Sequence, residues 1–217
     1  MDGVLFLSSD IHFNAFQETL ADEPVKVLNY SELAGLRTDF AIQKIYNRTG
    51  LTISREKLKV LTYRKRKSAS AMLKKNPPVA KNCREVIAEL SRRGVLLGLA
   101  SSSSSENVNL FLESSGTRKY FQTILSGDDI KIPKPDPEIF QVARKYLGLQ
   151  PSECLVFEDS ESGILSAQAD GINVVGVVGQ YDQKDFESFG VKRVITKLDE
   201  ILMFSELKIS DFNPMDS

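Results

Sequence analysis

The chain has 217 residues, of which 41% are hydrophobic and 26% are charged. This length and composition are typical of one globular core, or of a core with a smaller attached domain. The 28 basic and 29 acidic residues give a net charge of −1, which excludes a global positive field for nucleic acid or an anionic membrane. Any affinity for phosphate must therefore be local.

Two features of the sequence favour a cytoplasmic protein. Cys83 and Cys154 lie far apart and without the spacing of a metal site, which favours a reducing compartment over a disulfide framework. The longest apolar runs are far shorter than the roughly 18 to 20 residues that cross a bilayer, and the amino terminus lacks the basic segment of a signal peptide. We expect a cytoplasmic monomer that binds neither a membrane nor nucleic acid.

From about residue 11 to residue 75, apolar residues recur at helical spacing, and no strand pattern intervenes. One such series is Ile11, Ala15, Phe16 and Leu20, and a second is Ala41, Ile42, Ile45 and Tyr46. This segment is therefore predicted to be a helical module.

From Pro78 onward, helical patterns alternate with short apolar runs. The predicted helices span residues 82–94, 106–116, 136–148 and 162–171, and the predicted strands span residues 95–100, 154–157 and 173–178. Alternation of this kind, with strands apolar on both faces, indicates an α/β fold with a parallel sheet covered by helices. The last stretch, residues 205–217, is polar and is expected to fray.

In such sheets, ligands bind outside the carboxyl ends of the strands. After the first predicted strand comes a serine run, residues 101–105, whose hydroxyls and backbone N–H groups at a helix start could bind an anion. A flexible polar loop with a serine N-cap is an equal alternative. In a second loop, Lys134 lies between two prolines and could pair with a phosphate or a carboxylate, although a lone lysine is more often a solvated surface charge.

The third loop, EDSESG, places two adjacent carboxylates, Glu158 and Asp159, at a strand end. Neighbouring acids are costly there unless they are hydrated, capped or bound to a cation, and oxygen ligands suit Mg²⁺. Helix capping by Asp159 or Ser160 is the alternative. The three loops together, at one edge of one sheet, indicate a binding site more strongly than any one of them.

Four segments in this order, MDGVLF, GLASSSS, KPDPEIF and VFEDSESGILSAQADGI, resemble those of the haloacid dehalogenase superfamily, in particular its beta-phosphoglucomutase-like branch of phosphatases and phosphomutases. The resemblance spans Met1 to about Val178. It implies a Rossmann-like parallel-sheet core, residues 1–10 and 76–217, with a small helical cap, residues 11–75, inserted after the first motif. It also implies a Mg²⁺-assisted aspartyl-phosphate mechanism acting on a small phosphorylated metabolite, such as a sugar phosphate.

The resemblance further implies roles for individual residues. Asp2 matches the general acid and base, and Lys134 matches the lysine that steadies the phosphoryl oxygens and the nucleophile. Phosphate-binding hydroxyls match Ser101 and Ser102, and the Mg²⁺ ligands match Asp2, Glu158 and Asp159. Such parts suit phosphoryl transfer, which needs positioning and neutralised charge. Halide displacement would not need the metal-binding acids, which disfavours a dehalogenase.

In the cap, the resemblance matches His12, Arg37 and Lys65 to positions that meet substrate. Each has a plainer alternative: a structural histidine, a helix-start charge and a solvated helix face, respectively. Thr38 replaces the arginine of true phosphoglucomutases, which favours a phosphatase over a mutase, and Leu7 stands where the family commonly has an aspartate.

The nucleophilic aspartate of the family would stand two residues before Asp2, ahead of Met1, together with an apolar strand that lies in the middle of the family's sheet. Without that strand, its neighbours would leave buried N–H and C=O groups unpaired at roughly 1 to 3 kcal/mol each. Two hypotheses follow. Either the natural product extends upstream and is an active phosphatase, or the chain as written is a catalytically inactive phospho-ligand or Mg²⁺ binding protein with little or no turnover.

Overall fold

The computed structural model of this chain describes residues 1–204, so the predicted fraying of residues 205–217 lies outside the described part. Its helices are α1 (Ser9–Thr19), α2 (Thr38–Arg48), α3 (Arg55–Lys75), α4 (Cys83–Arg92), α5 (Ser105–Ser115), α6 (Glu138–Leu147), α7 (Glu161–Ala169), α8 (Gln183–Ser188) and α9 (Ile201–Phe204). Its strands are β1 (Gly98–Ala100), β2 (Thr123–Leu125), β3 (Leu155–Glu158), β4 (Asn173–Val177) and β5 (Arg193–Ile195). Among these helices, none combines the length and the hydropathy needed to span a membrane.

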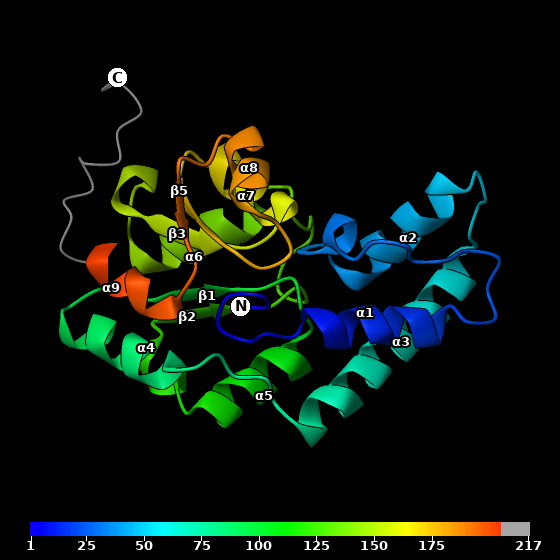
Figure 1. Ribbon diagram of the computed structural model, residues 1–217, viewed down its shortest axis with the longest axis horizontal. Coiled ribbons are helices and arrows are strands. Elements are labelled where there is room, and N and C mark those ends of the chain that lie inside the picture. Colours follow the sequence, from blue (N-terminus) through cyan, green and yellow to red (C-terminus); the bar gives the residue numbers. More distant parts are fainter. Residues whose placement is uncertain (205–217) are drawn as a thin grey trace.

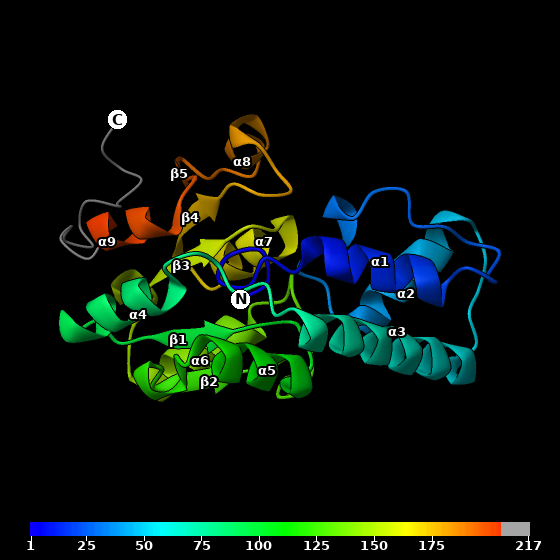
Figure 2. The ribbon, with the colours of Figure 1, turned by 60° about the horizontal axis from the view of Figure 1, so that its bottom comes forward.

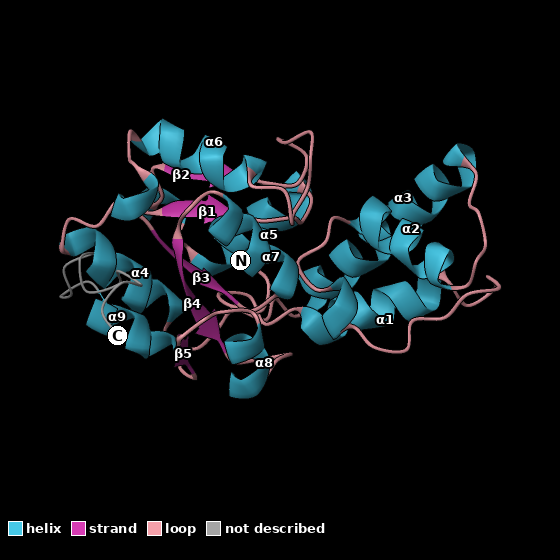
Figure 3. Ribbon diagram, turned by 90° about the horizontal axis from the view of Figure 1, so that it is seen from above, coloured by secondary structure: helices cyan, strands magenta, loops and turns pink. Residues whose placement is uncertain are grey.

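The strands form two parallel sheets, with β1 beside β2 in one and the order β3-β4-β5 in the other. Both sheets are visible in Figure 3, where β1 and β2 lie apart from the other three strands. The predicted α/β class with parallel strands is confirmed. The sequence pattern does not indicate β2 or β5, because these three-residue strands lie outside any longer apolar run, whereas the equally short β1 ends the apolar run 95–100.

Helices cover both faces of the strands, as strands that are apolar on both sides require. On one face, α4 and α5 pack with Leu99 and Val175 in a core that also contains the fully buried Phe6 and Phe111, whose ring centroids are 5.5 Å apart. On the other face, α6 and α7 pack against Leu125 and Ile172 in a second cluster. The strands are thus held between two apolar layers.

Helices α1, α2 and α3 form a module to one side of the strands (Figure 1). They enclose a separate apolar cluster that runs from Phe16 to Leu61. The four residues predicted to share a face in the second helix, Ala41, Ile42, Ile45 and Tyr46, are all buried. In the view of Figure 2, α1 and α3 reach from this module toward the strands, so the module meets the two sheets at one end only.

We predict that Phe111→Ala will lower the free energy of unfolding by about 3–5 kcal/mol, because it leaves a cavity beside the ring of Phe6 that the packed layers cannot fill. Urea denaturation followed by circular dichroism measures this cost. Phe40→Ala is the matched control, because Phe40 is 45% exposed. An equal cost at both positions would contradict this account of the core.

Candidate active site

One cavity of about 50 Å³ lies at the carboxyl ends of β1 and β3, under the helical module. Its lining includes eight of the residues that the sequence singles out: Asp2, His12, Lys65, Ser101, Ser102, Lys134, Glu158 and Asp159. They come from the amino-terminal loop, from α1 and α3, and from the loops that follow the strands. The predicted convergence of these loops is therefore present in the structure.

Asp2 is the centre of the hydrogen bonds in this cavity. Its Oδ1 atom accepts from the Ser8 hydroxyl at 2.5 Å and lies 3.3 Å from Nε2 of His12. Its Oδ2 atom accepts from the hydroxyls of Ser103 at 2.8 Å and Ser101 at 3.2 Å. Burial alone would raise the pKa of Asp2, but the hydrogen bonds from His12 and from the Ser8 hydroxyl hold that pKa well below its usual range. Asp2 is therefore a carboxylate at neutral pH.

Lys65 and His12 extend this network into the helical module. Lys65 Nζ lies 2.9 Å from Nδ1 of His12, and both side chains are buried. Burial and the neighbouring Lys65 lower the pKa of His12, and burial lowers the pKa of Lys65 to about 7. A neutral His12 that accepts at Nδ1 donates from Nε2. Lys65 therefore donates to His12, and His12 donates to Asp2.

A buried ion pair fixes the second side of the cavity. Lys134 Nζ donates to Glu158 Oε1 at 2.6 Å, and both side chains are less than a tenth exposed. Glu158 Oε2 accepts from the backbone N–H groups of Asp159 and Ser160 and from the Ser160 hydroxyl. Burial opposes ionisation of Glu158, but Lys134 lowers its pKa below the ordinary value. Ser160 also accepts from the N–H of Gly163 and is the N-cap of α7, the alternative that the sequence left open.

Asp159 has the opposite electrostatic environment. Burial, the charge of Glu158 and the charge of Asp2 raise the pKa of Asp159 to about 8, while Lys134 pairs with Glu158 instead. A bound cation would therefore stabilise the ionised form of Asp159.

Gly3 lies so close to Asp159 that a Cβ atom on Gly3 would be 1.7 Å from Asp159 Oδ2, and Gly3 has a φ of +69°. The glycine of the first motif is thus required by this contact.

The donor set fits Mg²⁺ in part. Asp2 and Asp159 supply hard oxygen ligands, and Mg²⁺ commonly uses one or two carboxylates with several waters. The predicted ligand role of Glu158 stays a prediction, and in this structure both of its oxygens also accept hydrogen bonds. In the described range, 1–204, no three His, Cys, Asp or Glu side chains are arranged as a complete metal site.

Hydrogen bonds hold the serine run, residues 101–105, in the lining of the cavity. The Ser101 hydroxyl accepts from the N–H of Ser103, whose carbonyl accepts from the N–H of Gly127. At the start of α5, Asp128 accepts from both the N–H and the hydroxyl of Ser105, and it also pairs with Arg66 of α3. The first N–H of α5 is therefore taken, and Ser101 and Ser102 remain the candidates for an anion.

Arg37 is not brought into this cavity. Its guanidinium pairs with Asp39 through two hydrogen bonds, and its Nη1 atom points to the carbonyls of Ile130 and Lys131 at 3.4 Å. In this structure it joins the helical module to the loop before Lys134. Ser8 and Tyr30 line or support the site without having been predicted, whereas Ser103 belongs to the predicted serine run. A lone serine or tyrosine, such as Ser8 or Tyr30, has no spacing pattern by which the sequence could have identified it.

Comparisons with known proteins show the family and the fold of the chain. A family model described as haloacid dehalogenase-like hydrolase matches residues 1–177. A protein of Thermotoga maritima named phosphorylated carbohydrates phosphatase is 32% identical over 189 residues, which cover 82% of each chain. A hydrolase of Pseudomonas syringae shares the fold at a TM-score of 0.85 and 24% identity over 95% of each chain. A beta-phosphoglucomutase of Clostridium difficile shares it at 0.82 and 18% identity over 97% of this chain and 95% of its own.

We predict that Gly3→Ala will cost more stability than Gly50→Ala, although both glycines have a φ near +70°. The backbone strain is about 1–2 kcal/mol at either position, and nothing lies within 4 Å of a Cβ atom at Gly50. At Gly3 the added methyl group must also displace the carboxylate of Asp159. Urea denaturation of both variants measures the difference, and equal losses would contradict the close contact.

We predict that Asp159→Asn will stabilise the protein without divalent cations as pH rises. The pKa of Asp159 is about 8 in the fold against an ordinary value of 3.8, so ionisation is disfavoured in the folded state. The gain is absent near pH 4, grows to a few kcal/mol toward pH 8 and then levels off. Thermal denaturation across this range measures it, with the exposed Asp10→Asn as control. A gain that is independent of pH would refute this origin.

Proposed function

The chain belongs to the haloacid dehalogenase-like hydrolases and is a hydrolase of the phosphatase type, and from this premise we propose that it is a Mg²⁺-dependent phosphatase of a small phosphorylated metabolite, such as a sugar phosphate. The observation that carries the proposal is the shared cavity of Asp2, Ser101, Lys134 and Asp159. It combines hydroxyl donors and a buried ammonium with carboxylates, which suits a phosphoryl group together with a cation.

Each side chain of the cavity would have a separate role in phosphoryl transfer. Lys134, oriented by Glu158, would neutralise phosphoryl oxygens, and the hydroxyls of Ser101 and Ser102 would donate to them. Asp2 is held as a carboxylate and would accept a proton from a water or hydroxyl group at its Oδ atoms. Mg²⁺ held by Asp2 and Asp159 would offset the negative charge of the phosphoryl group.

The predicted domain division supports a closed site. We propose that residues 11–75 are the cap and that residues 1–10 and 76–217 are the core. Ser162 donates to the carbonyl of Ala34 at 3.0 Å, and Tyr181 donates to that of Ser31 at 3.0 Å. Contacts of this kind would exclude water from the cavity when the cap is closed. The cytoplasmic location and the monomeric state stay predictions.

The substrate class is supported by the Thermotoga maritima relative, whose name is phosphorylated carbohydrates phosphatase. Within the cap, His12 and Lys65 line the cavity and would meet the remainder of the substrate. Arg37 stays a candidate only for an open cap, because its partners here are Asp39 and backbone carbonyls. The choice of a phosphatase over a mutase rests on Thr38, which also lines the cavity.

We predict that Lys134→Ala will weaken the binding of inorganic phosphate in the presence of Mg²⁺ at least tenfold, because it removes the buried ammonium. Isothermal titration calorimetry measures this loss, and the exposed Lys145→Ala is the control. Unchanged affinity would refute the site.

Phosphate release from a panel of sugar and nucleotide monophosphates tests the reaction. It is measured with this chain and with the same chain extended before Met1 by an apolar segment and an aspartate. Hydrolysis that is lost on Lys134→Ala or Asp159→Asn supports the phosphatase. Binding without turnover in both forms would instead support the alternative, an inactive phospho-ligand binding protein.

A further inference from the structure

Three buried side-chain atoms at the active-site cavity have no hydrogen-bond partner within residues 1–204. They are Nε of Arg66, Oγ of Ser102 and Oδ1 of Asn107, and all three residues line the cavity. Asn107 is only 3% exposed. Buried polar groups in folded proteins nearly always form hydrogen bonds, so each exception needs an explanation. A ligand in the cavity would supply the missing partner.

Contacts around Asp128 bring these three residues together. Arg66 of α3 donates from Nη1 to Asp128 Oδ1 at 2.8 Å, and Asp128 Oδ2 accepts from the first N–H of α5 at 2.9 Å. Asn107 lies in the first turn of α5. Ser102 lies in the loop before that helix, and a Cβ atom on Gly127 would be 2.4 Å from the Ser102 carbonyl oxygen. We refer to Arg66, Ser102 and Asn107 as the α3–α5 corner.

The α3–α5 corner has no net charge to offer a ligand. The guanidinium of Arg66 is paired with Asp128, and the other two side chains are neutral. The neighbouring Lys65 donates to His12 instead. A second anionic group on the ligand would need an unpaired cation, whereas an uncharged hydroxyl group needs only a donor and an acceptor. The charge of the corner therefore favours a hydroxyl group.

The hydrogen-bonding capacity of the corner also fits a hydroxyl group. Nε of Arg66 can only donate, and Oδ1 of Asn107 can only accept. One hydroxyl group can accept from Arg66 and donate to Asn107, because it has both capacities. Ser102 is proposed above to bind phosphoryl oxygens, so this hydroxyl group would lie on the part of the substrate that is near its phosphoryl group.

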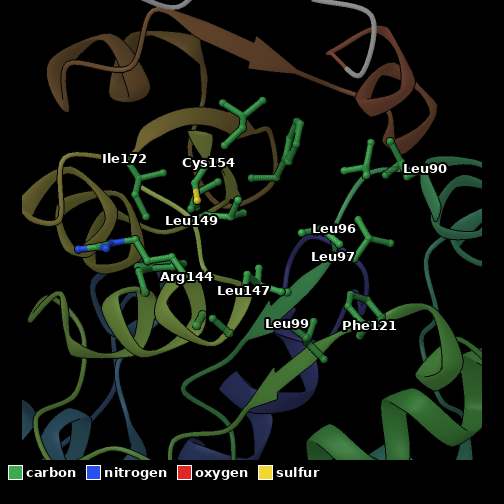
Figure 4. Close-up of a pocket in the computed structure, with 18 of the residues that line it drawn as sticks. Leu90, Leu96, Leu97, Leu99, Phe121, Arg144, Leu147, Leu149, Cys154 and Ile172 are labelled. Carbon is green, nitrogen blue, oxygen red and sulfur yellow. The ribbon is translucent and has the colours of Figure 1, made fainter. Parts of the chain in front are cut away.

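A larger cavity, of about 380 Å³, has a different lining. Leu97, Leu99 and Leu147 are among the apolar side chains that line it (Figure 4). Arg144, which is labelled in the same view, is paired with Asp170. In the described part of the chain, none of the buried side-chain atoms without a partner belongs to this lining. Of these two cavities, only the active-site cavity therefore requires a polar ligand.

We propose that Arg66 and Asn107 determine the specificity of the site by binding a hydroxyl group of the substrate, and so select polyol or sugar phosphates over alkyl phosphates. This inference rests on the proposed function, because it takes a phosphoryl group to occupy the same cavity. An alkyl phosphate would leave the amide of Asn107 and Nε of Arg66 buried and unpaired. A site built to bind a hydroxyl group rejects such an analogue for this reason.

The test compares pairs of ligands that differ only in their hydroxyl groups. Glycerol phosphate, erythritol phosphate and sorbitol phosphate are paired with n-propyl, n-butyl and n-hexyl phosphate, and inorganic phosphate is the reference. Isothermal titration calorimetry of the full chain with Mg²⁺ measures Kd, and kcat/KM replaces Kd for any ligand that is hydrolysed. In at least one pair, the polyol phosphate is expected to bind at least about tenfold more tightly.

Variants assign this preference to the corner. Asn107→Leu removes the amide and is expected to abolish the preference without lowering Tm, since an apolar residue replaces a buried group that has no partner. Arg66→Lys keeps a positive charge beside Asp128 but lacks Nε, and it is expected to abolish the preference as well. Asn109→Leu is the matched control, because Asn109 is exposed on the same helix, and it is expected to keep the preference.

The outcomes separate this inference from the proposed function. No binding of any of these phosphates would refute the phosphatase site and the corner with it. Binding of inorganic phosphate with equal affinities in every pair would refute the corner alone. A preference that survives Asn107→Leu and Arg66→Lys, or one that Asn109→Leu also abolishes, would overturn the assignment. If Asn107→Leu does not fold, the result for Arg66→Lys decides.

Discussion

Hydrogen bonding to Asp2 is the constraint that holds the candidate site together. Its two carboxylate oxygens have hydrogen-bond partners in the loop before α1, in α1 itself and in the loop after β1. A buried carboxylate needs such partners, because burial without them would force it to take up a proton. His12 also forms a hydrogen bond with Lys65, so one carboxylate connects two helices of the helical module to the strand ends.

Two adjacent acidic residues, Glu158 and Asp159, have opposite electrostatic environments in this fold. Glu158 and Asp159 are adjacent and almost equally buried, but only Glu158 has an ammonium partner and a set of N–H donors. Their pKa values therefore move in opposite directions. This division gives one acid a structural task, the positioning of Lys134, and leaves the other suited to a cation.

Much of this could be predicted from the sequence. Helical periodicity located the buried face of α2, and the residues after the apolar runs were those that meet in the cavity. The sequence could not indicate β2 and β5, because each has three residues and neither belongs to a longer apolar run like the one that ends in β1. It could not place Arg37, because the pairing with Asp39 depends on how α2 begins. Gly3 belongs to the first motif, but the reason for a glycine there, the close approach of Asp159, depends on the three-dimensional structure.

The carboxylate of Asp128 links two parts of the molecule that have different tasks. It accepts from the first residue of α5 and also from Arg66 on α3. Any swing of the helical module that draws Arg66 away would leave Asp128 bound to α5 alone, while the serine run beside it stays anchored to Asp2. The hydrogen bonds from Ser101 and Ser103 to Asp2 do not involve Arg66, so the loss of the pair between Arg66 and Asp128 leaves these serine side chains with their partner.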